Sequence, residues 1–515
     1  MPPELELHSI VKRFGHVLAN DGISMTVDQG EIRALVGENG AGKSTLMSVL
    51  YGELRPDAGE IYLRGERQIF RSPVDAIHAG LGMVHQSFML FPSLSVFENV
   101  IYGVEPTSRG LIDRRRATGE VRDIAERYGL RVNPSAKVAH LPVGVRQRVE
   151  ILKALYRGAD ILILDEPTGV LTPQEGEGLF ETLRALRAQG KTILFITHKL
   201  HEVMRLCDNA TVLRDGRVTA TVRVAATTPE ELSRFMTGRD VLLHVEKPAV
   251  EPGRLMLGVE QLTVLDEAHR HLVADVSLEV RAGEIVGIAG VAGNGQTELI
   301  EALVGLRPVG AGRVMLQGRD VTHGSVADHR RAGLAYVPED RVHVGVALGA
   351  SLAENLVMGF QSRPPISRRG LLRLDGIKEF ARRLIHRYSI KVSRASAPAS
   401  SLSGGNLQKV TLARELSHDA PCLIAEQPTR GLDIGAIEFV QQQLLDYRAK
   451  GNAILLVSAE LSEIRALSDR ILVMLEGKIV GEVPGAEATE SRLGMMMTGA
   501  HEEVTPRAVT AEGVP

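Results

Sequence analysis

The sequence predicts two tandem α/β domains, each built on a mainly parallel sheet that ends at a phosphate-binding loop. Three observations lead to this fold class. The chain has 515 residues, more than one ordinary core accommodates, and its motifs occur twice in the same order. The first copy holds a glycine-rich loop between a strand pattern and a helix pattern.

The repeat is defined by two constant spacings between corresponding motif positions. The pairs are Lys43 with Gln296 and Gln86 with Glu339 at 253 residues (296 − 43), and Leu141 with Leu402, Asp165 with Glu426 and His198 with Ala459 at 261 residues (402 − 141). One insertion of eight residues (261 − 253) between Glu339 and Leu402 accounts for the difference. The chain is therefore interpreted as a tandem duplication.

The repeat and the local composition set the domain limits. We expect a first domain at residues 1–243, a linker at 244–256 and a second domain at 257–500. The linker HVEKPAVEPGRLM breaks the pattern with charges, two prolines and a glycine. The segment 501–515 is polar and poor in large apolar residues, so it is predicted to be disordered.

Composition limits the classes of function. The sequence shows no apolar run long enough to span a bilayer and no signal-peptide pattern at its start. Cys207 and Cys422 are the only cysteines, which favours a reducing cytoplasm. The net charge of −3 argues against a global electrostatic grip on nucleic acid.

The stretch GENGAGKST is a complete phosphate-binding loop. The preceding EIRALV is a strand-like apolar run, and Leu46, Val49 and Leu50 follow at helical spacing. Glycines let successive N–H groups turn toward phosphate oxygens, and the helix start favours negative charge. Lys43 would reach the β- and γ-phosphates, and Ser44 would bind Mg²⁺. The predicted nucleotide-binding residues of this loop are Gly37, Glu38, Asn39, Gly40, Ala41, Gly42, Lys43, Ser44 and Thr45.

A second motif, ILILDEPT, follows the loop at the expected distance. Its apolar run delivers Asp165 to a strand end as a magnesium ligand and Glu166 as a base for water. An apolar run followed by Asp and Glu is weak evidence alone. The position of this motif after the Lys43 loop strengthens the evidence.

With these motifs in this order, the chain resembles the ATP-binding subunit of an ABC transporter over nearly its whole length. The resemblance implies two P-loop ABC ATPase domains, each with a helical subdomain, and ATP and Mg²⁺ as cofactors. It also implies that Gln86 joins the magnesium ligands and links the nucleotide to the membrane partner, and that His198 contacts the γ-phosphate. Phe14 resembles the aromatic residue that stacks on adenine, although a core position is an equal alternative.

The family pairs its two halves head to tail, so each ATP lies between the loop of one half and the LSGGQ-like segment of the other. By that rule the first site also includes Ser403, Gly404 and Gly405 of LSGGN, together with Asp433 of TRGLD. Nothing essential to hydrolysis is missing from this site.

The second site collects every departure from the family pattern. Gln296 replaces the lysine, Gln427 replaces the base and Ala459 replaces the histidine. Pro142 of LPVGV removes both a hydroxyl and a backbone donor. We therefore expect one site that hydrolyses ATP and one that does not, although the second keeps its glycines and Thr297 and could still hold nucleotide.

Within the family, the segments most resemble the fused ATPases of bacterial nucleoside importers, with simple-sugar importers such as those for ribose or galactose as the alternative. This implies two separate permease subunits, an extracytoplasmic solute-binding protein and a peripheral place at the cytoplasmic face of the cell membrane. Soluble tandem ATPases that act on ribosomes or DNA are a further alternative. Those usually keep two competent sites and a long charged linker, and neither occurs here.

Overall fold

A computed structural model describes residues 2–169, 171, 173–239, 247–248, 250–291, 293–497 and 499. The predicted tail 501–515 and part of the predicted linker lie outside these residues. The chain divides into two compact units, Met1–Leu243 with Asp433–Gly435, and His244–Leu432 with Ala436–Pro515.

The core of the first unit is a six-stranded sheet in the order β12-β11-β3-β10-β9-β6. All neighbouring pairs are parallel except β11 with β12, which confirms the mainly parallel sheet. Both faces of this sheet are covered, one mainly by helices and the other by α1 and a second sheet, which explains why β3, β9 and β10 read as continuous apolar runs. The strands are β3 (Ile32–Gly37), β6 (Leu81–Val84), β9 (Ile161–Asp165), β10 (Thr192–Thr197), β11 (Asn209–Arg214) and β12 (Arg217–Arg223).

A second sheet, which the sequence analysis did not predict, is antiparallel in the order β2-β1-β4-β5. Its apolar residues form one core cluster with α1 and one face of the parallel sheet. Its strands are β1 (Leu5–Phe14), β2 (Val17–Val27), β4 (Ala58–Leu63) and β5 (Glu66–Gln68).

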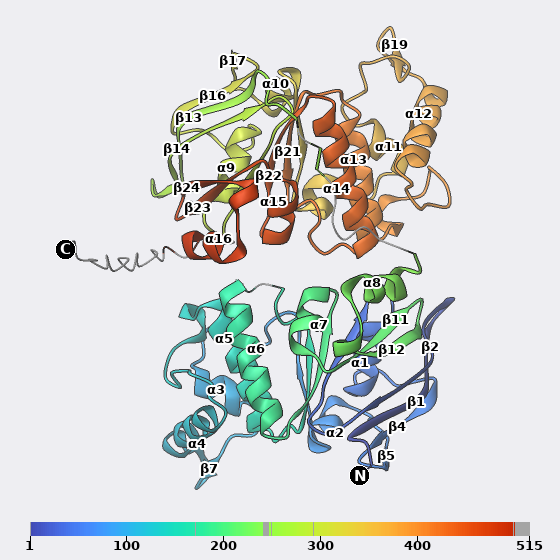
Figure 1. Cartoon of the computed structure of the whole chain (residues 1–515), viewed down its shortest axis with the longest axis vertical. Coiled ribbons are helices and arrows are strands. Elements are labelled where there is room, and N and C mark those ends of the chain that lie inside the picture. The colour runs from blue at the N-terminus through green and yellow to red at the C-terminus, as the bar shows by residue number, and fades with distance from the viewer. Residues whose placement is uncertain are drawn as a thin grey trace, which may run out of the picture. The chain divides into compact units, whose positions relative to one another are not determined.

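The remaining elements of the first unit include the predicted helical insert. In Figure 1, α3, α4 and a small hairpin lie on the side of this unit opposite the antiparallel sheet. The elements are α1 (Lys43–Leu50), α2 (Pro73–His78), α3 (Val96–Ile101), the hairpin β7 (Thr107–Ser108) and β8 (Leu111–Ile112), α4 (Arg114–Arg127), η1 (Val138–His140), α5 (Val143–Tyr156), α6 (Pro173–Ala188), α7 (Leu200–Leu206), η2 (Val224–Ala226) and α8 (Pro229–Thr237).

The second unit repeats this architecture, with a six-stranded sheet β18-β21-β22-β15-β23-β24 and an antiparallel sheet β14-β13-β16-β17. Its strands are β13 (Leu255–Leu265), β14 (His271–Arg281), β15 (Ile285–Ala289), β16 (Ala311–Leu316), β17 (Arg319–Asp320), β18 (Leu334–Val337), β19 (Ser367–Arg368), β20 (Leu371–Leu372), β21 (Cys422–Glu426), β22 (Ala453–Val457), β23 (Arg470–Leu475) and β24 (Lys478–Pro484). Its helices are α9 (Gln296–Leu303), α10 (Val326–Arg331), the π-helical turn η3 (Arg341–Gly345), α11 (Leu352–Val357), α12 (Leu374–Arg387), η4 (Ala399–Ser401), α13 (Gly404–Leu416), α14 (Ile434–Ala449), α15 (Leu461–Leu467), η5 (Gly485–Glu487) and α16 (Glu490–Met497).

The expectation of one eight-residue insertion is wrong. The spacing between corresponding elements rises in steps: α3 and α11 start 256 residues apart (352 − 96), α4 and α12 start 260 apart (374 − 114), and η1 and η4 start 261 apart (399 − 138). The extra residues therefore lie in three connections, from β18 to α11, from α11 to α12 and from α12 to η4, and the first of these holds η3. Two fixed motifs reveal only the net difference, whereas surface connections absorb insertions separately.

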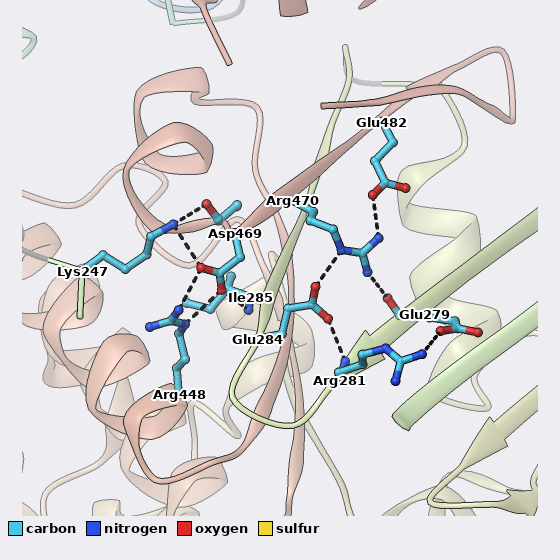
Figure 2. Close-up of polar contacts among 10 residues, drawn as sticks. Lys247, Glu279, Arg281, Glu284, Ile285, Arg448, Asp469, Arg470 and Glu482 are labelled. Carbon is cyan, nitrogen blue, oxygen red and sulfur yellow. Dashed lines mark hydrogen bonds and ion pairs between the residues drawn. The ribbon is translucent and has the colours of Figure 1, made fainter. Parts of the chain in front are cut away.

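The described part of the predicted linker is bonded to the second unit. Lys247 Nζ donates to Ser468 O at 2.6 Å and pairs with Asp469 Oδ1 at 3.2 Å. Arg448, only 2% exposed, donates to Pro248 O at 2.7 Å and pairs with Asp469 at 2.8 Å. Figure 2 shows Lys247 and Arg448 converging on Asp469 beside a separate pair, Arg470 with Glu284.

Candidate ATP site

The first phosphate loop joins β3 to α1, as predicted. Gly42 precedes the helix with φ 98°, and Lys43 is its first residue. The lysine side chain lies back across the loop, and its Nζ donates to Gly37 O at 2.7 Å and to Glu38 O at 3.0 Å. The ammonium group is thus held at the loop itself, where a phosphate would compete for its donors.

Two glycines of this loop are required by the fold. A Cβ on Gly42 would lie 2.2 Å from Ala19 O, and one on Gly37 would lie 2.4 Å from Leu213 O. Both distances are far below van der Waals contact, so the backbone of the neighbouring strands excludes any side chain at these positions.

The predicted base lies at the centre of a hydrogen-bonded group. Glu166 follows the last residue of β9 with φ 45°. Gln86 Nε2 donates to Glu166 Oε2 at 3.1 Å, and His198 Nδ1 lies 2.8 Å from Glu166 Oε1. The structure therefore brings together all three residues predicted to act in catalysis, from the ends of three different strands.

Opposing effects set the ionisation of these groups. Burial raises the pKa of Asp165, and the Glu166 charge adds to this while Lys43 opposes it. Burial alone would also raise the pKa of Glu166, but the hydrogen bond with His198 and the charges of His198, Lys43 and Lys199 lower it below its ordinary value. Glu166 is therefore ionised at neutral pH and able to accept a proton.

Two further predicted nucleotide contacts are accessible. Ser44 is exposed in the first turn of α1, where its hydroxyl is free to meet a ligand. Phe14, at the end of β1, is 47% exposed with Lys12 Nζ 5.8 Å from its ring centre. The structure thus excludes the alternative of Phe14 as a core residue, and its role in stacking stays a prediction.

The oxygen ligands fit a magnesium ion that is bound largely through phosphate. Ser44 and Asp165 offer one hydroxyl and one carboxylate, and Mg²⁺ in such sites takes one or two protein oxygens besides phosphate and water. Among the residues that the structure describes, no cluster of three His, Cys, Asp or Glu could hold a metal unaided.

The second loop has the same backbone with a different side chain. Gly295 has φ 92°, and Gln296 is the first residue of α9. Gln296 and Lys43 are equally buried at 6% exposure. Gln296 Nε2 is buried with no hydrogen-bond partner among the described residues, close to Gly290. The amide thus fills the place of the lysine without its charge.

The strand-end residues of the second unit have different partners. Glu426, which corresponds to Asp165, accepts a hydrogen bond from Tyr336 Oη at 2.7 Å, and burial raises its pKa. Gln427 has the same φ of 45° as Glu166, but its Oε1 accepts from Ala459 N at 3.0 Å. The backbone position of a base is retained, and the side chain cannot accept a proton from water.

The LSGGN segment of the second unit and the LPVGV segment of the first also differ. Ser403 stands at the N-cap position of α13, and Ser403 and Gly404 are both exposed, with Gly405 partly so. Asp433 directly precedes α14 and is half-buried. In the first unit, Pro142 stands at the N-cap position of α5 without a side-chain capping bond, and Gly144 N donates to Glu175 Oε1 at 3.1 Å.

Glu175 was missed by the sequence analysis. Its carboxylate accepts the hydrogen bond of an N–H group at the start of α5. Ala436 stands at the corresponding place in the repeat (175 + 261). This difference between the halves was visible in the sequence, but only the fold shows that α6 brings Glu175 to α5.

None of the helices within the described ranges is long and apolar enough to cross a membrane.

Comparison with known proteins agrees with this geometry. The sequence profile of the ABC transporter family matches residues 20–169 and 273–430. A crystal structure of archaeal ribosome recycling factor aABCE1, in complex with ribosomal stalk protein aP1, has a TM-score of 0.61 at 20% identity and covers 92% of this chain and 90% of that one. This likeness supports the fold alone.

The sequence relatives extend over nearly the full length. The chain is 47% identical to the guanosine import ATP-binding protein NupO of Bacillus subtilis, in an alignment that covers 98% of this chain and 99% of NupO. It is 43% identical to the nucleoside import ATP-binding protein NupA of Lactococcus lactis, covering 96% and 98%. It is 40% identical to the ribose import ATP-binding protein RbsA 1 of Streptomyces avermitilis, covering 94% and 92%. The chain therefore belongs to the ABC transporter ATP-binding family, whose members hydrolyse ATP.

Proposed function

We propose that the chain powers the import of a nucleoside through two separate permease subunits, with an extracytoplasmic solute-binding protein delivering the solute. The observation that carries this proposal is the full-length similarity to two nucleoside import ATPases, at 47% and 43% identity. The ribose relative at 40% identity makes a simple-sugar importer the second candidate. In either case the chain is peripheral, at the cytoplasmic face of the membrane.

We further propose that only one of the two ATP sites hydrolyses ATP. The competent site combines the first phosphate loop, Asp165, Glu166 and His198 with Ser403 and the glycines of LSGGN. Two observations within single units support this assignment. Glu166 is held in a hydrogen-bonded group with a lowered pKa, and Ser403 and Gly404 are exposed. The other site would pair the second phosphate loop with LPVGV, where Gly144 N–H is already bonded to Glu175.

Mg²⁺ would supply charge neutralisation at the β- and γ-phosphates when it is bound with ATP. Gln86 would join Ser44 and Asp165 as its ligands. It would also link the bound nucleotide to the permease. Lys43 would orient the phosphates, and Glu166 would accept the proton of the attacking water.

A transport assay tests the proposed substrate. The chain, its copurifying permeases and their binding protein are reconstituted in proteoliposomes with ATP on the cytoplasmic side, and uptake of labelled guanosine and of labelled ribose is compared. We expect guanosine uptake that the Lys43→Ala variant abolishes. Uptake of ribose alone would support the second candidate. Cosedimentation of the chain with ribosomes instead of membrane proteins would contradict both.

A further inference from the structure

The loop that follows β18 in the second unit is tied to the TRGLD segment by two arginines. Arg430 of TRGLD forms an ion pair with Glu339, which corresponds to Gln86. In return, Arg341 Nη2 donates to Arg430 O at 3.0 Å. The Glu339 loop and the residues just before Asp433 are thus joined by two contacts in opposite directions.

Arg341 also lies near the LSGGN segment. It begins the π-helical turn η3, which packs against α13. A Cβ placed on Gly431 would lie 3.3 Å from Arg341 Nη2, and one on Gly404 would lie 3.9 Å from its Cζ. The guanidinium group therefore bonds to TRGLD and lies beside Gly404 at the start of α13.

The Arg341 side chain is half-buried. Burial lowers its pKa, and no carboxylate pairs with it among the residues that the structure describes. Partial desolvation of a guanidinium group costs free energy, and its hydrogen bond among the described residues is to a carbonyl rather than to a carboxylate. Its place beside the Glu339 loop, TRGLD and the start of LSGGN favours a role beyond packing.

The first unit lacks both contacts. Gly169 stands at the position of Arg430 (430 − 261), and Phe88 stands two residues after Gln86. Gln86 instead donates to Glu166, the base of its own half. The loop after the strand is therefore tied to local catalysis in the first unit, and to TRGLD and LSGGN in the second.

We propose that Arg430 and Arg341 are positioning residues that transmit movement of the Glu339 loop to LSGGN and to Asp433. The inference rests on the proposed function, in which the Glu339 loop faces a permease and LSGGN completes the competent ATP site. A half that no longer hydrolyses ATP would by this route still control hydrolysis in the other half. Neither arginine touches a reacting atom.

The test compares ATP hydrolysis by the isolated chain with hydrolysis by the chain bound to its permeases. The ratio of the two rates measures permease control. We expect Arg430→Glu to change this ratio by about fivefold or more, with the rate of the isolated chain changed by less than about twofold. The charge-swapped variant Glu339→Arg with Arg430→Glu should recover the ratio, because the ion pair is rebuilt with reversed polarity. Arg341→Met should change the ratio in the same direction as Arg430→Glu.

Arg319→Glu is the matched control, because it makes the same charge change at an exposed residue of β17. It should leave the ratio unaltered. Two results would overturn the proposal: a normal ratio in Arg430→Glu, or a swapped variant no better than either single change. Failure of the proposed function is seen separately. If Ser403→Arg hydrolyses ATP normally, LSGGN does not complete the competent site, whatever the arginine variants do.

Discussion

The two phosphate loops share a backbone and differ in chemistry. Gly42 and Gly295 have φ values of 98° and 92°. A Cβ on Gly42 would lie 2.2 Å from Ala19 O, and one on Gly295 would lie 2.6 Å from Leu272 O. The strand beside each loop thus demands glycine whether or not nucleotide binds. The glycine pattern is therefore evidence for the fold of the loop, whereas the side chain that follows it, lysine or glutamine, determines whether the loop offers a positive charge to phosphate.

The residues after β9 and β21 show the same combination of a shared backbone and a different side chain. Glu166 and Gln427 share a φ of 45°, a conformation that costs a non-glycine residue free energy. The second unit keeps this backbone although the proton acceptor is gone.

The largest effect is expected from Glu166→Gln. Hydrolysis should fall about 10²–10⁴-fold, because the amide cannot accept a proton from water, while ATP binding should persist. Steady-state ATPase rates and nucleotide binding by the permease complex measure the two quantities. Gln427→Ala is the matched control in the second unit and should retain most of the activity. A Glu166→Gln variant with substantial turnover would show that another group is the base.

Ser403→Arg should impair hydrolysis as severely as Lys43→Ala, because a bulky cation would obstruct the phosphate position at LSGGN. The expected loss is about 10²-fold or more, comparable with removal of a donor from a preorganised anion site. Pro142→Arg makes the mirror change at LPVGV and should have a much smaller effect on hydrolysis. ATPase assays of all three variants decide the point. An inactive Pro142→Arg with an active Ser403→Arg would reverse the assignment of the sites.

Gly295→Ala should destabilise the second unit, by about 1–3 kcal/mol, because the added methyl group meets a backbone carbonyl in a strained conformation. Thermal unfolding measures the change. Gly293→Ala is the control, since Gly293 has φ 91° but no atom within 4 Å of its Cβ position. The difference between the two variants isolates the close approach. Equal stabilities would mean that the fold does not require Gly295.

The smallest effect is expected from Gln296→Lys. The lysine would restore a phosphate contact, but Gln427, Ala459 and Pro142 would remain, and residues that act as a unit are not repaired singly. Turnover should not increase, although nucleotide binding should improve. The decisive pair is Lys43→Ala with and without Gln296→Lys. Hydrolysis rescued by the lysine would abolish the distinction between the two loops.

Much of the first site could be predicted because its residues follow local patterns. A strand, a glycine turn and a helix determine where Lys43 and Ser44 lie, and an apolar strand delivers Asp165 and Glu166 to the same sheet edge. The family resemblance placed Gln86, Glu166 and His198 in one site, and the structure shows Gln86 and His198 both in contact with Glu166.

Contacts between distant segments could not be predicted in this way. Glu175 meets Gly144 because α6 packs beside α5, and no local pattern encodes that packing. The same holds for Arg341, whose η3 turn lies in one of the three insertions. The antiparallel sheets were also missed, because long twisted strands with register shifts, such as β1 and β13, dilute the alternation of apolar and polar residues.

The bonds of Lys247 and Pro248 matter for anyone who wishes to express the second unit alone. A fragment that starts at Leu255, where β13 begins, would contain the whole first strand but would lose both residues. Arg448 would then lose its carbonyl acceptor, and Asp469 would keep one cation instead of two. A fragment that starts before Lys247 keeps this group whole and is the better choice for expression, crystallisation and calorimetry.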